Sequence, residues 1–163
     1  EENLPETIGY TWKGTSLEPK RLIIPTLNVD SYVQKVGVDQ NTQIAVPNNI
    51  HIAGWFVDSV LPGADGLSII DGHVNGRNSD EGVFKRLKEL KQGDEVIVES
   101  GDGTRTTFKV YSGESLPKDS VADKLFSQVP TIRHQLNLIT CTGTYDSTSR
   151  TYSDRWLTIL EAV

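Results

Sequence analysis

Short runs of apolar and β-branched residues, each ended by glycine, proline or a polar turn, recur along this chain from residue 21 to its end. Such runs are typical of β-strands. Two of them, 94–100 and 104–111, are joined by a glycine–aspartate–glycine turn and predict a hairpin. The others lie at 21–25, 31–38, 67–71, 134–140 and 155–163. The pattern predicts a mainly β domain whose sheet closes or nearly closes, since closure leaves no unpaired strand edges.

Two segments carry helical patterns instead. Residues 81–90 repeat apolar side chains at intervals of three and four, which predicts a helix, and Ser79 or Asp80 is its expected N-cap. Residues 118–126 favour one or two further helical turns. Residues 46–66 are rich in turn formers and are expected to cross the surface without regular structure. Short helices are therefore expected only on the flank of the barrel.

Length and charge limit the possible organisation and partners. A chain of 163 residues suits a single core, and we expect an arm at residues 1–20 followed by one folded domain at 21–163. The arm is polar and is interrupted by proline and glycine. The 16 basic and 22 acidic side chains give a net charge of −6, which argues against nucleic acid or anionic lipid as the main partner.

Cys141 is the only cysteine of the chain, and it follows the apolar run "LNLIT". Strand alternation places it on the same face as Asn137 and Ile139, at the point where the strand is expected to end. A lone cysteine is usually a small buried hydrophobe. At the rim of a sheet it is equally placed to act as a nucleophile, so the residue itself leaves both interpretations open.

A cysteine nucleophile needs an imidazole to stabilise its thiolate and to protonate a leaving amine. His73, at the mouth of the strand that ends in "IID", is the best candidate, whereas His51 and His134 lie in less suitable segments. Arg155 opens the expected last strand, where its guanidinium would lie near Cys141 and stabilise an oxyanion. Arg150, in the same connection, is a rival. The histidines and the cysteine show no metal-ligand spacing, so no metal is expected.

Three segments follow one another in the order "GHVNGRNSDEGVFKRL", "LKQGDEVIV" and "LNLITCTGTYD". Together they resemble the sortases, the surface transpeptidases of Gram-positive bacteria, and the resemblance extends from residue 21 to the C-terminus. The stretches "VPNNIHIAGWF" and "PGADG" ahead of the histidine are most similar to class F.

The resemblance implies a closed eight-stranded β-barrel with a few short flanking helices. Cys141 would be the nucleophile, His73 the family histidine and Arg155 the family arginine. The residues expected to contact substrate are Thr140, Thr142 (through its backbone N–H) and Asn75. No acidic cluster matches the calcium site of some class A members, so neither a metal nor another cofactor is implied.

The activity implied is that of a cysteine transpeptidase. It would cleave an LPxTG-like sorting signal of a surface protein after threonine, through a thioester acyl-enzyme. The acyl group would then pass to a cell-envelope amine, from a cell-wall precursor or a pilin. The enzyme is expected to be a monomer at the extracellular face of the membrane, tethered through a segment absent from this sequence.

Two other functions stay open. A plain cysteine peptidase would share the thiol and the histidine but would only hydrolyse. A catalytically inactive extracellular β-barrel would serve as a binding module, with Cys141 buried and unreactive. Residues 4–7 also spell "LPET", the form of a sorting signal, and a pseudo-substrate role for them competes with chance.

Overall fold

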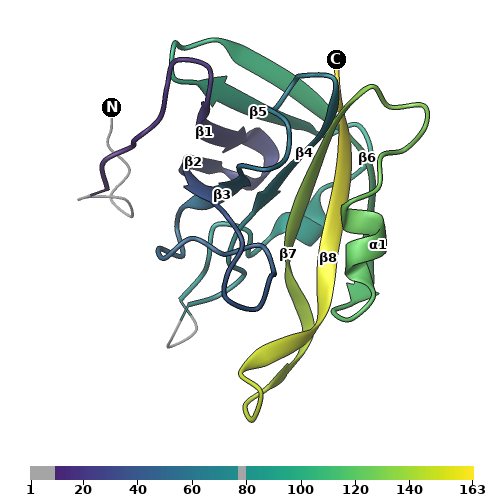
Figure 1. Ribbon diagram of the computed structural model, residues 1–163. Coiled ribbons are helices and arrows are strands. Elements are labelled where there is room, and N and C mark those ends of the chain that lie inside the picture. The colour runs from purple at the N-terminus through teal and green to yellow at the C-terminus, as the bar shows by residue number, and fades with distance from the viewer. Residues whose placement is uncertain (1–9, 77–79) are drawn as a thin grey trace.

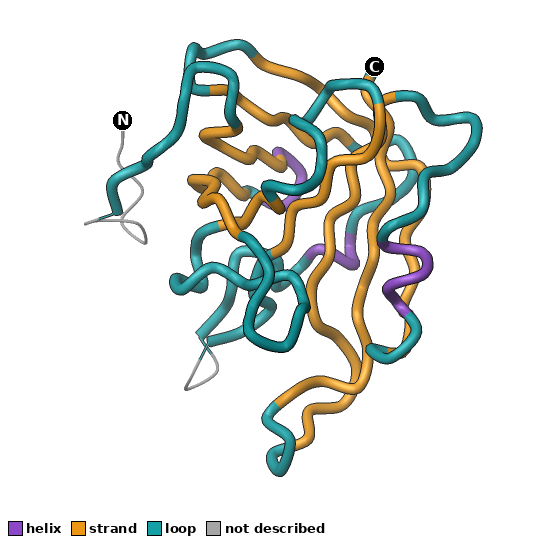
Figure 2. The backbone as a smooth tube through the Cα atoms, viewed as in Figure 1, coloured by secondary structure: helices purple, strands orange, loops and turns teal. Residues whose placement is uncertain are grey.

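The computed structural model describes residues 10–76 and 80–163, and within them eight strands close into one barrel (Figure 2). The strands are β1 (Pro19–Ile24), β2 (Val29–Val36), β3 (Ala53–Phe56), β4 (Gly66–Asp71), β5 (Glu95–Ser100), β6 (Arg105–Pro117), β7 (His134–Asp146) and β8 (Thr151–Ala162). The short helices are η2 (Pro25–Leu27), η4 (Leu87–Glu89) and α1 (Val121–Leu125). Around the barrel the order is β1-β2-β3-β4-β7-β8-β6-β5, and β5 pairs with β1. The expected fold class and the β5–β6 hairpin are confirmed.

Two hydrophobic clusters lie on opposite faces of the sheet. The inner cluster fills the barrel and includes Leu136 and Leu138, whereas Ile139 belongs to an outer cluster beneath α1. This is the alternation expected along β7. Burying one such leucine or isoleucine side chain stabilises the fold by about 1.5–3 kcal/mol. The outer cluster therefore holds α1 against the outer face of the sheet, beside β8 in Figure 1. Cys141 lies on the same face, two residues beyond Ile139.

The helix expected at residues 81–90 is wrong. This segment consists of turns followed by the single 3-10 turn of η4, and Ser79 lies outside the described residues. Its backbone donors are used elsewhere, because the N–H groups of Gly82 and Phe84 bond to the carbonyls of Val74 and His73. A Cβ on Gly82 would lie 2.2 Å from the His73 oxygen. Close packing on the chain that follows β4 therefore replaces the helical ladder, although Phe84 still enters the core.

The crossing expected at residues 46–66 is also wrong in part, since it contains strand β3. This strand has four residues, all buried, and it runs parallel to β2 with Val33 opposite Ala53. A strand buried on both faces shows no alternation of polar and apolar residues. The sequence pattern of this segment therefore showed only the turn-forming residues on either side of β3 and not the strand itself. The residues between β2 and β3 form the β2–β3 loop (37–52).

Strands β7 and β8 are longer than expected. Cys141 does not end its strand and Arg155 does not begin one, since β7 continues to Asp146 and β8 starts at Thr151. Figure 1 shows the two strands leaving the barrel as a twisted two-stranded ribbon. Tyr145 and Tyr152 pack edge-on across the ribbon, with ring centroids 5.2 Å apart. The sequence of the ribbon shows no alternation of polar and apolar residues, because both of its faces are exposed to solvent.

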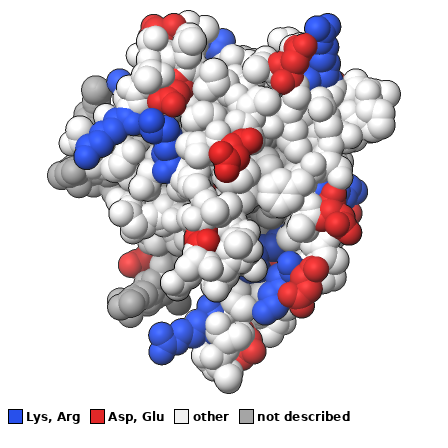
Figure 3. Space-filling view, viewed as in Figure 1, with Lys and Arg blue, Asp and Glu red and all other residues white. Residues whose placement is uncertain are grey.

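The described part of the arm packs on the barrel. The indole of Trp12 donates a hydrogen bond to the carbonyl of Pro19, and Tyr10 lies against Tyr32. The "LPET" stretch lies outside the described residues. Acidic and basic side chains are interspersed over the face shown in Figure 3. Within the described residues, no helix has the length and apolar character needed to cross a membrane.

Candidate active site

Cys141 on β7 and Arg155 on β8 are direct partners across an antiparallel pair. The guanidinium of Arg155 is held by its own strand. Its Nη1 donates to the carbonyls of Tyr152 and Asp154, at 3.1 and 2.9 Å, and its Nη2 donates to Thr151 Oγ1 at 3.2 Å. No carboxylate in the described part of the chain forms an ion pair with it. The positive charge thus remains available beside the sulfur.

The Cys141 thiol is partly buried. Desolvation by burial raises its pKa, the charge of Arg155 lowers it, and the carboxyl of Asp71 raises it further. Because desolvation is the largest of these effects, the neutral thiol predominates at pH 7 in the free protein. Formation of the nucleophile therefore requires a base or the binding of a substrate that changes the surroundings of the sulfur.

His73 lies two residues beyond the end of β4, which runs parallel to β7 with Asp71 opposite Ile139. The hydroxyl of Thr140 donates to the Gly72 carbonyl at 2.7 Å, and this bond fixes the chain just before His73 against the strand of Cys141. The His73 ring itself does not bond to the thiol. Its Nε2 lies 2.6 Å from the carbonyl oxygen of Pro47, and since a carbonyl only accepts, Nε2 carries a proton and Nδ1 remains for other chemistry.

A cavity of about 540 Å³ lies on one side of Cys141, between the β2–β3 loop and α1. Arg155 and Asp71 line it together with several apolar side chains. Three of these are exposed: Val38 by 56%, Val46 by 56% and Phe126 by 52%. We call this cavity the apolar groove. Its volume and mixed lining suit a peptide segment with an apolar residue.

A second cavity, of about 460 Å³, lies on the other side of Cys141. Its lining includes Asn75, Lys85 and Tyr152, which form a chain of hydrogen bonds: Asn75 Nδ2 donates to the Tyr152 hydroxyl at 2.6 Å, and Lys85 Nζ donates to Asn75 Oδ1 at 3.0 Å. We call this cavity the polar pocket. The residues that line both cavities are Thr140 and Cys141. The sulfur therefore stands at the junction of two binding spaces.

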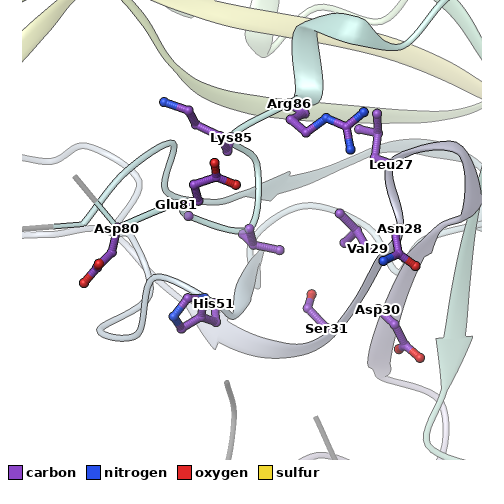
Figure 4. A pocket seen from close by; sticks show the side chains of 12 residues that line it. Leu27, Asn28, Val29, Asp30, Ser31, His51, Asp80, Glu81, Lys85 and Arg86 are labelled. Atoms are coloured by element: carbon purple, nitrogen blue, oxygen red, sulfur yellow. The ribbon is translucent and has the colours of Figure 1, made fainter. Parts of the chain in front are cut away.

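A third cavity, of about 680 Å³, is lined by none of Cys141, Arg155 and His73. Ser31 and His51 line it on one side and Glu81 and Lys85 on the other (Figure 4). His134 is also far from Cys141, because it lies at the start of β7, where its Nδ1 is 3.2 Å from a carboxylate oxygen of Asp65. Size alone therefore does not locate the chemistry. Of the three histidines, His73 is the one that follows Gly72, whose carbonyl accepts a hydrogen bond from Thr140, the neighbour of Cys141.

The other expected site residues are distributed unevenly. Thr142 and Asn75 line the polar pocket, whereas the Thr140 side chain is buried and its hydroxyl is already bonded to the backbone. Arg150, the rival of Arg155, is exposed near the tip of the ribbon with a φ of 58° and does not line the groove. Arg155 is thus the arginine that faces the thiol. The catalytic and binding roles of all these residues stay predictions.

Sequence reasoning missed Asp71 and Tyr152. Asp71 is 6% exposed, lines the apolar groove, and its Oδ1 has no hydrogen-bond partner. Burial raises the pKa of Asp71 from 3.8 to about 8. A signal was present in "IIDGH", where a carboxylate ends a run that is otherwise apolar. Tyr152 gave no signal, because it lies in a segment whose composition is typical of a loop.

Within residues 10–76 and 80–163, no three histidine, cysteine, aspartate or glutamate side chains converge as metal ligands would. The site instead places a sulfur beside a guanidinium at the edge of a groove, with the His73 imidazole on the segment that is bonded to the Cys141 strand. This arrangement can attack a carbonyl, stabilise the resulting oxyanion and protonate a leaving group.

Comparison with known proteins gives a consistent result. The family model described as the sortase domain matches residues 22–163. A lid mutant of sortase A from Corynebacterium diphtheriae is 24% identical, and the match covers 89% of this chain and 69% of that one with a TM-score of 0.67. Sortase C-1 from Actinomyces oris is 26% identical, with 88% and 72% covered and a TM-score of 0.63.

Sortase E1 from Streptomyces coelicolor, solved with a tripeptide in its active site, is 22% identical, with 91% and 89% covered and a TM-score of 0.66. A comparison with curated protein sequences gave no significant match. The structural likenesses named here are to classes A, C and E, so the assignment to class F stays a prediction.

Proposed function

This chain belongs to the sortase family of cysteine transpeptidases, and from that premise we propose that it cleaves an LPxTG-like sorting signal after threonine and transfers the acyl group to an amine. The observation that carries this proposal is the position of Cys141, opposite Arg155 and at the junction of the apolar groove and the polar pocket. A transpeptidase needs a separate space for the acyl donor and for the acceptor on either side of its nucleophile.

In the first half-reaction, His73 takes the proton of the Cys141 thiol, and the thiolate attacks the threonine carbonyl carbon to form a tetrahedral oxyanion. Arg155 stabilises this charge, and the backbone N–H of Thr142 is a second candidate donor. The peptide C–N bond then breaks, the departing amine takes a proton from His73, and a thioester to Cys141 remains. His73 must exchange its contact with Pro47 for one with the reacting groups before this step.

In the second half-reaction, an amine attacks the thioester, loses its proton to His73 and displaces the Cys141 thiolate as an amide forms. The acyl donor occupies the apolar groove, whose exposed apolar side chains suit the leucine and proline of a sorting signal. The acceptor enters through the polar pocket, whose Asn75 and Tyr152 offer hydrogen bonds to an amine-bearing chain. Its source is a cell-wall precursor or a pilin.

The site of action that we propose is the extracellular face of the membrane, with the chain tethered as a monomer. Peptide binding in the groove is supported by the relative solved with a tripeptide in its active site. The two alternatives, a hydrolytic peptidase and an inactive binding module, differ from the transpeptidase in what happens at Cys141.

The test uses a fluorogenic LPxTG peptide with and without an added amine, and Cys141→Ala as the control. The expected results are a thioester adduct on Cys141 by mass spectrometry, an amide product when the amine is present, and neither with Cys141→Ala. Hydrolysis that an amine never diverts would favour the peptidase. Absence of any adduct over a panel of sorting peptides would favour the inactive module.

A further inference from the structure

Asp71 is a buried carboxyl group to which the proposed reaction assigns no role. It is the last residue of β4 and points to the outer face of the sheet, as Ile69 two residues earlier does. Its Oδ1 is enclosed, because a Cβ on the paired residue Gly54 would lie 2.5 Å from this oxygen and 2.9 Å from the Pro47 ring. A glycine at position 54 leaves the room that the carboxyl occupies.

The same face of the sheet carries Cys141. Asp71 is opposite Ile139 in the parallel β4–β7 pair, and Cys141 lies two residues further along β7 on the face of Ile139. Adjacent strands lie about 4.8 Å apart, so the carboxyl and the thiol are close neighbours on one surface. Both also line the apolar groove.

The surroundings of Asp71 contain few groups that compensate a negative charge. β3 offers Gly54, Trp55 and Phe56, and the β2–β3 loop offers the ring of Pro47. The titratable and charged groups that share the groove or the same strand end are Cys141, Arg155, Lys118, Asp119 and His73. Arg155 is held by the backbone of its own strand, and the His73 ring is bonded to Pro47. In the described residues, neither oxygen of Asp71 forms an ion pair.

We propose that Asp71 is a positioning residue that acts through Cys141. As a neutral carboxylic acid it does not repel the thiolate of Cys141. As a carboxylate it disfavours formation of the thiolate by electrostatic repulsion. At pH 7 the buried acid keeps its proton, so the floor of the groove carries no negative charge where a thiolate must form. Above about pH 8 the two groups compete for ionisation, since each charge raises the pKa of the other. The inference deepens the proposed function and rests on it for its catalytic meaning.

The test measures thiol reactivity, which requires no sorting peptide. Rates of Cys141 alkylation by iodoacetamide are compared from pH 6 to 10 for the wild type, Asp71→Asn and Asp119→Asn. Asp119 lines the same groove but is exposed, so it serves as a matched control. We expect Asp71→Asn to react at the wild-type rate within about twofold at pH 6.5 and about 3- to 10-fold faster at pH 9, whereas Asp119→Asn follows the wild type.

Superimposable pH profiles for Asp71→Asn and the wild type would overturn the inference. If Asp71→Asn does not fold, carbon-13 NMR of the aspartate carboxyls in the wild type decides instead. One carboxyl that titrates near pH 8 supports the proposal, and full ionisation of every aspartate by pH 6 rejects it. If Asp71→Asn changes the alkylation rate of Cys141 but the protein cleaves no sorting peptide, the proposed function is contradicted and the effect of Asp71 on the thiol still stands. The two failures are therefore distinguishable.

Discussion

Asn137 donates its side-chain amide to the carbonyl oxygen of Leu125 at 2.8 Å, and this bond ties β7 to α1 beneath the apolar groove. The Asn137 side chain is fully buried, and its Oδ1 accepts from Gln135 at 2.9 Å. Gln135 in turn accepts a hydrogen bond from the backbone of Val129. A polar network thus connects the strand that carries Cys141 to the short helix that forms the opposite wall of the groove.

Replacing Asn137 by alanine should loosen this wall. The Leu125 carbonyl and the Gln135 amide would each lose a partner in a buried site, so we expect a loss of about 1–3 kcal/mol in the free energy of unfolding. Because α1 lines the groove and does not touch the reacting atoms, KM for a sorting peptide should rise more than kcat falls. Urea unfolding and steady-state kinetics check both effects. An unchanged unfolding midpoint would show that the network contributes nothing to stability.

Arg155 and Arg150 should behave differently when each is replaced by alanine. Loss of Arg155 removes the positive charge opposite Cys141 and with it the effect that lowers the thiol pKa. We expect acyl transfer to fall by about 10²–10³-fold, as for loss of one oxyanion donor, and alkylation of Cys141 at pH 8 to become slower. Arg150→Ala, exposed near the ribbon tip, should stay within about twofold of the wild type in both assays. A comparable loss in Arg150→Ala would contradict the assignment.

Asp71→Asn should also change how stability depends on pH. In the unfolded chain Asp71 ionises near its usual pKa of about 3.9, but burial in the folded protein holds its proton until about pH 8. The folded state therefore binds more protons between these values, and its free energy of unfolding falls as pH rises through this window. The Asp71→Asn variant has no carboxyl at this position, so its free energy of unfolding does not fall in this way. Its stability relative to the wild type should increase from pH 4 to 8 by about 5–6 kcal/mol, which is 1.36 kcal/mol for each of about four pKa units, and then level off.

Urea unfolding of both proteins at pH 4, 6, 8 and 9 measures this difference. Asp119→Asn, an exposed aspartate on the same groove, serves again as the matched control. A difference between Asp71→Asn and the wild type that is independent of pH would mean that the pKa of Asp71 is the same in the folded and unfolded states.

The fold and the candidate nucleophile could be predicted from sequence because their signals are local. Alternation along β7 placed Leu138 and Cys141 on opposite faces of the sheet, and glycine-bounded runs marked most strands. The helix expected at 81–90 failed for a non-local reason: the backbone of Gly82 and Phe84 is bonded to the chain after β4. Apolar spacing reports which side chains are buried, and it does not report where the backbone hydrogen bonds go.

The site was predictable only where chain order carried information. The pairing of Cys141 with Arg155 follows from two strands joined by a short connection, although the length of their ribbon did not. The burial of Asp71 depends on Gly54 and Pro47, which come from a strand and a loop that the sequence pattern did not resolve. The contact between Asn75 and Tyr152 joins residues 77 positions apart, and neither residue alone indicates it.

Tyr152→Phe should separate aminolysis from acylation. The substitution removes the hydroxyl that accepts a hydrogen bond from Asn75 in the polar pocket. Arg155 keeps its contact, because it bonds to the backbone carbonyl of Tyr152 and not to the side chain. We therefore expect thioester formation at close to the wild-type rate, with the ratio of amide product to hydrolysis product reduced about three- to tenfold, a loss typical of one hydrogen bond. Product analysis at several amine concentrations gives this ratio.

Tyr111→Phe is the matched control for that experiment, since Tyr111 is an exposed tyrosine on β6, and it should leave the product ratio unchanged. Equal loss of thioester formation and aminolysis in Tyr152→Phe would place the tyrosine on the acyl-donor side of Cys141. That result would contradict the division of the site into an apolar groove for the donor and a polar pocket for the acceptor.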